Sequence, residues 1–344
     1  MKKVMWIMVS LIWLLACKND RNSNQTSNTT PDRPVISVIA PEFNADSAYY
    51  FVEKQVDFGP RVPNTPAHRQ CGDYLINTLK IYGAEVTVQE FVAEAYNGTK
   101  LHSRNIIASY FPQATKRILL AAHWDTRHVA DKDAVDQNKP IDGANDGGSG
   151  VGILLEIARV LQADTLKPNV GIDIIFFDAE DYGEPENAKP EELPNKGNNK
   201  VYWCLGSQYW AANKHKPNYS AYYGILLDMV GAKGSTFAKE GTSMENAPSV
   251  VEKVWNIANA LGHGGMFINQ TSTGITDDHV FVNRIAKINM IDIIDYDSAG
   301  DDYFGSYHHT HADNMLIIDK TTLKAVGQTV LQTLYEEGNA NEAI

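Results

Sequence analysis

The sequence has few cysteines, few basic residues and no Lys/Arg cluster after its first residues. Of 344 residues three are Cys, and 42 Asp and Glu outnumber 30 Lys and Arg, which gives a formal net charge of −12 at pH 7. A nucleic-acid partner requires a concentrated basic face, so the composition argues against nucleic-acid binding. With so few cysteines a disulfide framework is not indicated, and sequence alone does not pair Cys71 with Cys204.

The amino terminus lacks an apolar run long enough for a membrane span. Val4 to Leu15 is about twelve residues, against roughly 20 for a bilayer, and it follows Lys2 and Lys3. This pattern predicts a signal peptide over residues 1–17. Leu14-Leu15-Ala16-Cys17 resembles the bacterial lipoprotein cleavage box, which implies lipidation at Cys17; a plain cleaved signal is the alternative.

We therefore expect an exported protein that is anchored through Cys17 to membrane lipid of the bacterial cell envelope. Its catalytic domain would lie in the periplasm or at the cell surface. Residues 18–39 are mostly polar and predict a flexible tether, since they cannot bury enough surface to order themselves.

Residues 40–344 read as alternating helices and strands without an internal repeat. The fold expected is a single α/β/α domain with a central mixed, mostly parallel sheet and helices on both faces. Helical periodicity predicts helices near 46–58, 71–82, 150–161, 248–261 and 321–335, the first of them capped by Asp46 or Ser47. Apolar or alternating runs predict strands near 85–91, 105–110, 118–122, 172–177, 225–227 and 288–294, of which 118–122 is expected to be central.

Two long polar segments interrupt this pattern, 124–144 and 184–200. Irregular segments of this length inside a compact domain are usually functional. Both follow predicted strands at the same sheet edge, and we expect them to frame the mouth of a pocket.

Three short clusters follow predicted strands: Asp142 to Asp146, Phe177 to Asp181 and His308 to Asp313. Open α/β folds place their sites at the carboxyl edge of the sheet, where these clusters can meet. Asp146, Asp181 and His309 would supply two carboxylates and an imidazole, which leaves a position open on zinc, as in catalytic sites. Glu180 is then the natural general base.

Each cluster also has a structural interpretation when it is taken alone. Asp146 could cap the helix that begins near Gly148, Glu180-Asp181 could be a solvated pair, and His309 could be an ordinary surface residue. Asp313 could orient the ligand histidine or cap a turn. The order of the clusters along the chain favours a common site.

The motifs resemble the zinc aminopeptidase family and, within it, the glutaminyl-peptide cyclotransferases, over residues 40 to the end. The matching segments are 58–63, 105–107, 122–125, 143–146, 176–181, 206–207, 227–231, 277–279 and 309–310. The resemblance implies conversion of amino-terminal glutamine to pyroglutamate, with peptides or proteins that begin with Gln as substrates.

The resemblance also implies roles for individual residues. One Zn²⁺ per chain would be held by Asp146, Asp181 and His309, with Glu180 catalytic and two further catalytic aspartates at Asp228 and Asp277. Phe304 would help to line the substrate pocket.

Two positions depart from the animal cyclases. Those enzymes carry Glu where this chain has Asp181, and Trp where it has His308. We expect His308 to line the pocket, with Trp124 or Trp203 as the aromatic wall.

The two-metal aminopeptidases hold a second zinc at positions that match His123 and Asp228, so His123 is a possible remnant of that site. The alternative function is therefore a zinc aminopeptidase with one or two metals. A third possibility is a non-catalytic peptide- or metal-binding lipoprotein, which the intact set of catalytic residue types disfavours. We expect a monomer.

Overall fold

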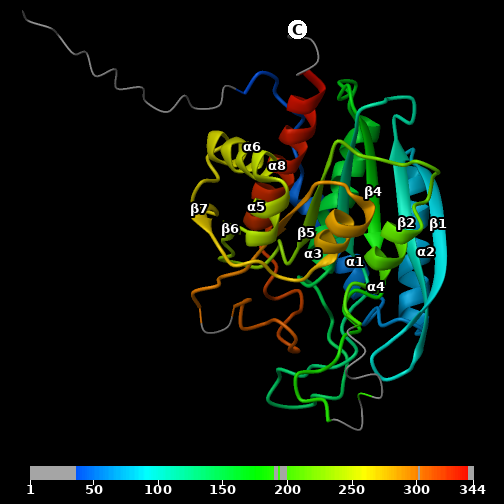
Figure 1. The fold of residues 1–344 in the computed structure, drawn as a ribbon. Coiled ribbons are helices and arrows are strands. Elements are labelled where there is room, and N and C mark those ends of the chain that lie inside the picture. Colours follow the sequence, from blue (N-terminus) through cyan, green and yellow to red (C-terminus); the bar gives the residue numbers. More distant parts are fainter. Residues whose placement is uncertain (1–35, 190–192, 194–199, 301–302, 340–344) are drawn as a thin grey trace, which may run out of the picture. The chain divides into compact units, whose positions relative to one another are not determined.

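The computed structural model describes residues 36–189, 193, 200–300 and 303–339 (Figure 1). The described residues belong to one compact unit. The expected signal peptide, Cys17 and the tether up to residue 35 lie outside the described residues. In the described ranges, no helix has both the length and the apolar character needed to cross a membrane.

A six-stranded mixed sheet forms the centre of this unit, in the order β1-β2-β4-β3-β5-β8. β1 pairs antiparallel with β2 and β2 with β4, whereas β4, β3, β5 and β8 are parallel neighbours. The mostly parallel sheet and the central position of 118–122 are confirmed. The strands are β1 (Glu85–Glu94), β2 (Lys100–Tyr110), β3 (Arg117–His123), β4 (Gly171–Phe177), β5 (Tyr223–Asp228) and β8 (Met290–Ile294).

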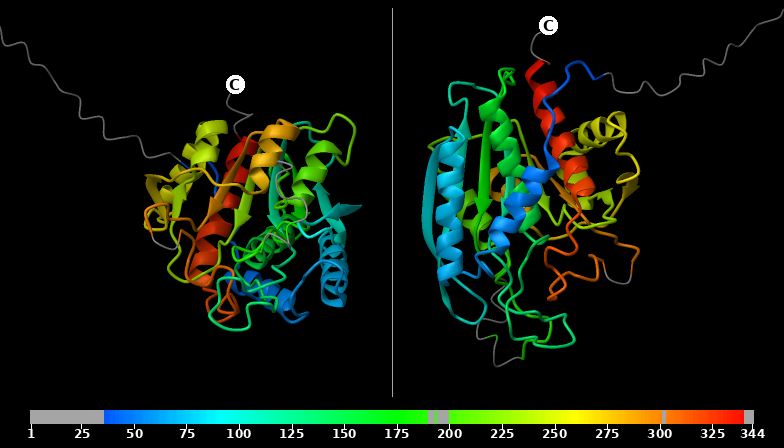
Figure 2. Two further views of the ribbon diagram at one scale, coloured as in Figure 1. Left: turned by 60° about the horizontal axis from the view of Figure 1, so that its bottom comes forward. Right: turned by 180° about the vertical axis from the view of Figure 1, so that it is seen from behind.

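Helices cover both faces of the sheet, as expected (Figure 2). On one face, a large core joins alternate strand residues such as Leu120 and Ile174 to α1 (Ala45–Val56), α2 (Pro66–Ile81), α3 (Gly148–Ala163), α6 (Pro248–Ala260) and α8 (Lys320–Asn339). On the other face, Leu119 and Ile175 pack with α4 (Leu205–Ala212) and the π-helical segment η2 (Val282–Ala286), which directly follows α7 (Asp278–Phe281).

The first helix begins at a different cap from the one expected. The Asn44 side chain accepts a hydrogen bond from the Ser47 backbone N–H, so Asn44 caps α1 instead of Asp46 or Ser47. Asn has a short side chain and is among the preferred N-cap residues. The residue ranges of the other expected helices overlap the observed ones.

Gly150 allows helix α3 to lie close to strand β5. A Cβ atom at this position would stand 2.2 Å from the Leu227 carbonyl oxygen, so a larger residue would push the helix away from the sheet. The close approach holds the segment before α3, which carries Asp146, over the ends of the parallel strands.

The register aligns the carboxyl ends of the parallel strands. His123 at the end of β3 pairs with Phe177 of β4, and Asp228 of β5 pairs with Ile294 of β8. The residues that follow these strands therefore leave the sheet at one edge, which is where parallel α/β sheets bind ligands.

A second, two-stranded parallel sheet was not expected from the sequence. It pairs β6 (Phe237–Lys239) with β7 (Phe267–Thr271), and the short helix α5 (Gly241–Asn246) follows β6. Both strands are short, and most of β7 is exposed or half-buried, so neither gives the apolar or alternating run that identifies a strand.

Candidate metal and active site

The structure brings the three predicted metal ligands together at the carboxyl edge of the sheet. His309 Nε2 lies 3.5 Å from Asp181 Oδ1 and 3.9 Å from Asp146 Oδ2. All three residues are buried. His308 joins them, because one ligand atom from each of Asp146, His308 and His309 lies within 4.8 Å of the others. His309 is thus the residue that both predicted carboxylate ligands approach, with His308 as an additional nitrogen donor beside Asp146.

The electrostatics of these donors fit a metal cation. Burial and the neighbouring Asp146 raise the pKa of Asp181 well above its usual value, and Asp181 Oδ2 has no hydrogen-bond partner among the described residues. Burial, His308 and Arg127 hold the pKa of His309 well below its usual value. A neutral imidazole is the form that binds metals, and a cation would compensate the crowded carboxylates.

A hydrogen-bonding carboxylate fixes the segment that carries Asp146. Asp313 accepts hydrogen bonds from the backbone N–H groups of Asn145 and Asp146 at 2.7 and 3.0 Å. Asp313 therefore orients the Asp146 ligand segment and not the ligand histidine, which had been one of its two possible roles. Buried supporting partners of this kind hold metal ligands in place.

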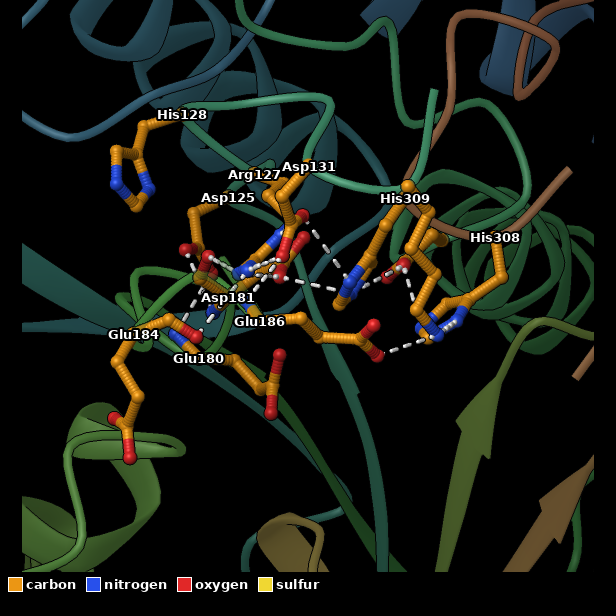
Figure 3. A network of polar contacts seen from close by, with 12 residues as sticks. Asp125, Arg127, His128, Asp131, Glu180, Asp181, Glu184, Glu186, His308 and His309 are labelled. Carbon is orange, nitrogen blue, oxygen red and sulfur yellow. Dashed lines mark hydrogen bonds and ion pairs between the residues drawn. The ribbon is translucent and has the colours of Figure 1, made fainter. Parts of the chain in front are cut away.

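Arg127 and Asp131 support the other ligands, as Figure 3 shows. The guanidinium donates to both carboxylate oxygens of Asp131 at 2.6 and 2.8 Å, and to the Asp181 carboxylate at 3.4 Å. Asp131 Oδ1 in turn lies 3.6 Å from His309 Nδ1. The buried Arg127 guanidinium thus connects two of the predicted metal ligands, Asp181 directly and His309 through Asp131.

The sequence analysis did not identify Arg127 and Asp131. The sequence feature that could have identified them is a pair of opposite charges four residues apart, shortly after the central strand. It also missed Asp125, whose carboxylate accepts the backbone N–H groups of Glu180 and Asp181 at 3.0 and 3.2 Å. Asp125 belongs to a motif that the sequence analysis matched, but it received no role there.

Glu180 lies beside the predicted metal ligands and lines the same cavity. Burial raises the pKa of the Glu180 carboxyl well above its usual value, with Asp277 and Asp181 contributing in the same direction and His123 opposing them. Burial also raises the pKa of Asp228 to about 6. Groups whose pKa lies near neutrality suit proton transfer.

The carboxylate of Asp277 caps helix α7, where it accepts the backbone N–H of Asp278. One ligand-type atom from each of Glu180, Cys204 and Asp277 lies within 4.8 Å of the others. Behind Asp277 lies a buried polar group in which His279 Nε2 contacts Glu240 at 3.1 Å and His279 Nδ1 lies 3.7 Å from Asp292. The three predicted catalytic carboxylates all border the cavity.

His123 lies at the position of the possible second-metal remnant. His123 Nε2 is 3.0 Å from Asp146 Oδ1 and 3.2 Å from Asp228 Oδ1. Burial lowers the pKa of His123, but the neighbouring carboxylates of Asp125, Asp146 and Asp228 outweigh it and raise the pKa well above its usual value. In this arrangement the imidazole is bound by carboxylates as an ion-pair partner.

A cavity of about 280 Å³ joins these groups. The long segments supply Arg127, Lys132 and Glu186 to its wall, as the sequence predicted for 124–144 and 184–200. Its remaining lining consists of Asp146, Glu180, Asp181, Trp203, Asp228, Met229, Ile275, Thr276, Asp277, Ile294, Phe304, His308 and His309.

The placement of Phe304 and His308 in the pocket wall agrees with the predictions, but that of Trp124 does not. Trp124 is fully buried, stacks on His68 with 4.3 Å between ring centroids, and donates its indole N–H to the Arg104 carbonyl. The prediction for Trp124 is wrong because its side chain turns into the core. Trp203 forms the aromatic wall instead.

Several residues at the site have left-handed backbone conformations that are unusual for residues other than glycine. The φ angles are 54° at Ala179, 57° at Cys204, 47° at Met229 and 59° at His309. Each of these four residues either belongs to the candidate site or is next in sequence to a residue that does. Such conformations persist where surrounding contacts hold them, and they cluster at functional sites.

Comparison with known proteins gives the family. The sequence model of peptidase family M28 matches residues 105–334, more than half of the chain. The chain belongs to peptidase family M28. The family match includes every predicted metal and catalytic residue.

Proteins that resemble this M28 chain include two solved structures and one further relative. A Zn-dependent exopeptidase from Parabacteroides distasonis is 55% identical, with a TM-score of 0.81 over 86% of this chain and 99% of that one. Glutaminyl cyclase from Bacteroides thetaiotaomicron is 53% identical, with the same TM-score and coverage. Glutaminyl-peptide cyclotransferase of Drosophila melanogaster is 25% identical over 76% of this chain and 73% of its own length.

Proposed function

We propose that this M28 chain is a zinc-dependent glutaminyl-peptide cyclotransferase, which converts the amino-terminal glutamine of peptides or proteins to pyroglutamate and releases ammonia. The observation that carries the proposal is the position of Glu180. It is a mostly buried carboxyl with a raised pKa, and it lines the same small cavity as Asp146, Asp181 and His309. The 53% identity to a bacterial glutaminyl cyclase supports this choice within the family.

One zinc ion per chain would be held by Asp146, Asp181 and His309. When bound there, zinc would polarise the γ-carboxamide carbonyl of glutamine and stabilise negative charge on its oxygen. Asp313 holds the backbone of Asp146, and Arg127 holds the side chain of Asp181, through the hydrogen bonds described above. His308 is neutral, since burial lowers its pKa to about 3 despite Asp146, and it accepts a hydrogen bond from Lys132 at 2.9 Å.

Glu180 performs the proton transfers. Cyclisation requires that the α-amine lose a proton as it attacks the amide carbon, and that the departing nitrogen gain one as it leaves as ammonia. A carboxyl whose pKa is raised toward neutrality can take the first proton and deliver the second. Asp277 and Asp228 border the same space, and Asp277 helps to raise the pKa of both Glu180 and Asp228.

Apolar and aromatic side chains line part of the cavity that would receive the glutamine. Phe304 and Trp203 supply aromatic walls, and Ile275 and Ile294 supply apolar ones. Because the nucleophile and the electrophile belong to one residue, holding that residue in a folded conformation supplies much of the rate advantage.

An aminopeptidase is the second candidate, and the grouping of His123, Asp146 and Asp228 favours it. One ligand atom from each of these residues lies within 4.8 Å of the others, which would accommodate a second metal. Hydrolysis requires an activated water, for which two metals are a frequent provision.

A dipeptide that begins with glutamine separates the two candidates. We expect ammonia to be released and the primary amine to disappear, in equal amounts, while free glutamine stays at background. Free glutamine without ammonia would instead identify a peptidase and would reject the proposed cyclisation.

The proposed location is the bacterial cell envelope, with a lipid at Cys17 as the anchor. The support is the residue pattern before Cys17. Cell fractionation of the full chain and its Cys17→Ser variant tests it: the wild type should sediment with membranes and label with a fatty acid, and the variant should do neither.

A further inference from the structure

A separate group of ligand-type side chains borders the active-site cavity, beside the predicted zinc donors. It consists of Glu180, Cys204 and Asp277, and one ligand atom from each lies within 4.8 Å of the others. The Cys204 thiol donates a hydrogen bond to Glu180 Oε1 at 3.1 Å. Cys204 and Asp277 are 0% and 4% exposed. Cys204 has no part in the function proposed above.

The backbone fixes the thiol at this place. The Cys204 N–H donates to the Glu180 carbonyl at 2.9 Å, and the Leu205 N–H donates to the Ala179 carbonyl at 3.0 Å. Cys204 itself adopts a left-handed conformation with φ 57°, which is uncommon for a residue with a side chain. The two segments are thus held together by main-chain bonds, which direct Sγ toward the Glu180 carboxyl.

The group carries donor capacity that the protein itself leaves unused. Asp277 Oδ2 is buried and has no hydrogen-bond partner among the described residues. Burial, Glu180 and the adjacent aspartates raise the pKa of the Cys204 thiol well above its usual value. A buried site rich in carboxylates and without a cation costs free energy that a bound cation would recover.

We propose that Glu180, Cys204 and Asp277 form a second cation site, selective for thiophilic ions such as Cd²⁺ or excess Zn²⁺, and that its occupation inhibits the enzyme. Thiolate and carboxylate ligands together suit Zn²⁺ and Cd²⁺ and do not suit Mg²⁺. Tetrahedral zinc with a sulfur at ~2.3 Å and oxygens at ~2.0 Å places its ligands about 3.5 Å apart. The Sγ–Oε1 distance of 3.1 Å needs to open by only a few tenths of an ångström.

Binding has a defined proton balance and route. The ion forms a bond to Sγ as the thiol proton passes to solvent, along with the Glu180 proton where that carboxyl is protonated. The ion can enter through the cavity, because Glu180 and Asp277 line it. Since the ion would occupy the proton-transfer carboxyl, it should inhibit by competing with substrate. The binding itself does not depend on the proposed function.

Cadmium titration of the full-length, zinc-loaded protein tests the site. A bound cadmium thiolate has an ultraviolet band from sulfur-to-metal charge transfer, and oxygen and nitrogen ligands do not produce this band. We expect the band in the wild type and in the matched control Cys71→Ala, because Cys71 lies on helix α2 with its side chain buried in the core. In Cys204→Ser we expect no band and at least tenfold weaker additional cadmium binding by equilibrium dialysis. Mg²⁺ should bind in none of them.

A single-thiol variant covers the case in which Cys204→Ser fails to fold. The chain has three cysteines, so Cys17→Ser with Cys71→Ala leaves Cys204 as the remaining thiol. That variant should keep the band and should lose turnover of a glutamine dipeptide over the same cadmium range. The proposal is overturned if the single-thiol variant shows no band as cadmium is raised. It is also overturned if folded Cys204→Ser binds cadmium and is inhibited as the wild type is.

Discussion

The indole ring of Trp203 lies parallel to the imidazole of His309, with an interplanar angle of 2° and 5.8 Å between the ring centroids. The Arg127 guanidinium stands 4.7 Å from the centre of the same indole. Trp203 therefore contacts His309, a predicted metal ligand, and Arg127, whose guanidinium contacts a second predicted ligand, Asp181. It connects the substrate wall to the metal ligands.

Replacing Trp203 should weaken substrate binding. Trp203→Ala removes an aromatic wall whose contacts are worth about 0.5–1.5 kcal/mol beyond area burial, so we expect KM to rise about two- to tenfold. Trp203→Phe should recover most of this loss. Trp124→Phe is the matched control: it lies in the core, so thermal stability should fall while KM stays unchanged. A rise in KM for the control alone would contradict the assignment of the wall.

Removing the Arg127 charge should weaken both the fold and metal binding. Arg127→Met leaves the buried carboxylates of Asp131 and Asp181 without their cation, which costs about 3–5 kcal/mol for a buried pair. Loss of a partner that supports a metal ligand typically weakens metal affinity about 10–100-fold. The zinc dissociation constant of Arg127→Met should therefore rise by that factor.

Lys139→Met is the control for Arg127. Lys139 pairs with Asp136 on the surface of the same segment, and an exposed pair contributes little. Chelator competition and chemical denaturation should therefore show no change in this variant. Unaltered zinc affinity in Arg127→Met would show that the Arg127 contacts do not support the ligands.

Glu240 should contribute stability that is lost in acid. Burial raises its pKa, but hydrogen bonds from His279, Ser243 and Thr242 outweigh burial and lower the pKa to about 2. The folded-state pKa lies below the unfolded one, so the stabilisation is present above the unfolded value, near 4.5, and disappears as the pH falls toward 2. The contribution at neutral pH is at most about 3 kcal/mol.

Denaturation of Glu240→Gln across pH measures this contribution. The variant should be less stable than the wild type at pH 7, and the two curves should converge as the pH falls from about 4.5 toward 2. Glu245→Gln, an exposed position on the same helix α5, should follow the wild type throughout. A constant difference between Glu240→Gln and the wild type down to the lowest pH would show that the ionised carboxylate is not responsible.

The sequence predicts the sheet well and places the candidate ligands near its edge, because both rest on local signals. Apolar runs such as 118–122 and 172–177 identify buried parallel strands, and the residues directly after them must leave at one edge. Asp181 follows β4 closely, so its approach to the sheet edge is fixed by the strand. The ends of the strands thus determine most of the candidate site.

Side-chain direction and long-range contacts are not available from local signals. Trp124 and Trp203 both lie near site residues in sequence, but Trp124 turns into the core and Trp203 into the cavity. Arg127 and Asp131 reach Asp181 and His309 only because the long segment 124–144 folds over the sheet edge where those two residues lie. The left-handed backbone conformation at Cys204 directs its side chain to Glu180, and no residue pattern predicts that conformation.

The most direct test of the account is the rate and zinc content of Glu180→Gln measured on the same sample. Glutamine keeps the shape of the side chain but cannot carry the proton, so turnover should fall by about 10²–10⁴-fold. Zinc should remain at one per chain, because Asp146, Asp181 and His309 are intact. His309→Ala, in contrast, should lose zinc and activity together. Near-normal turnover in Glu180→Gln with zinc bound would contradict the proton-transfer role of Glu180.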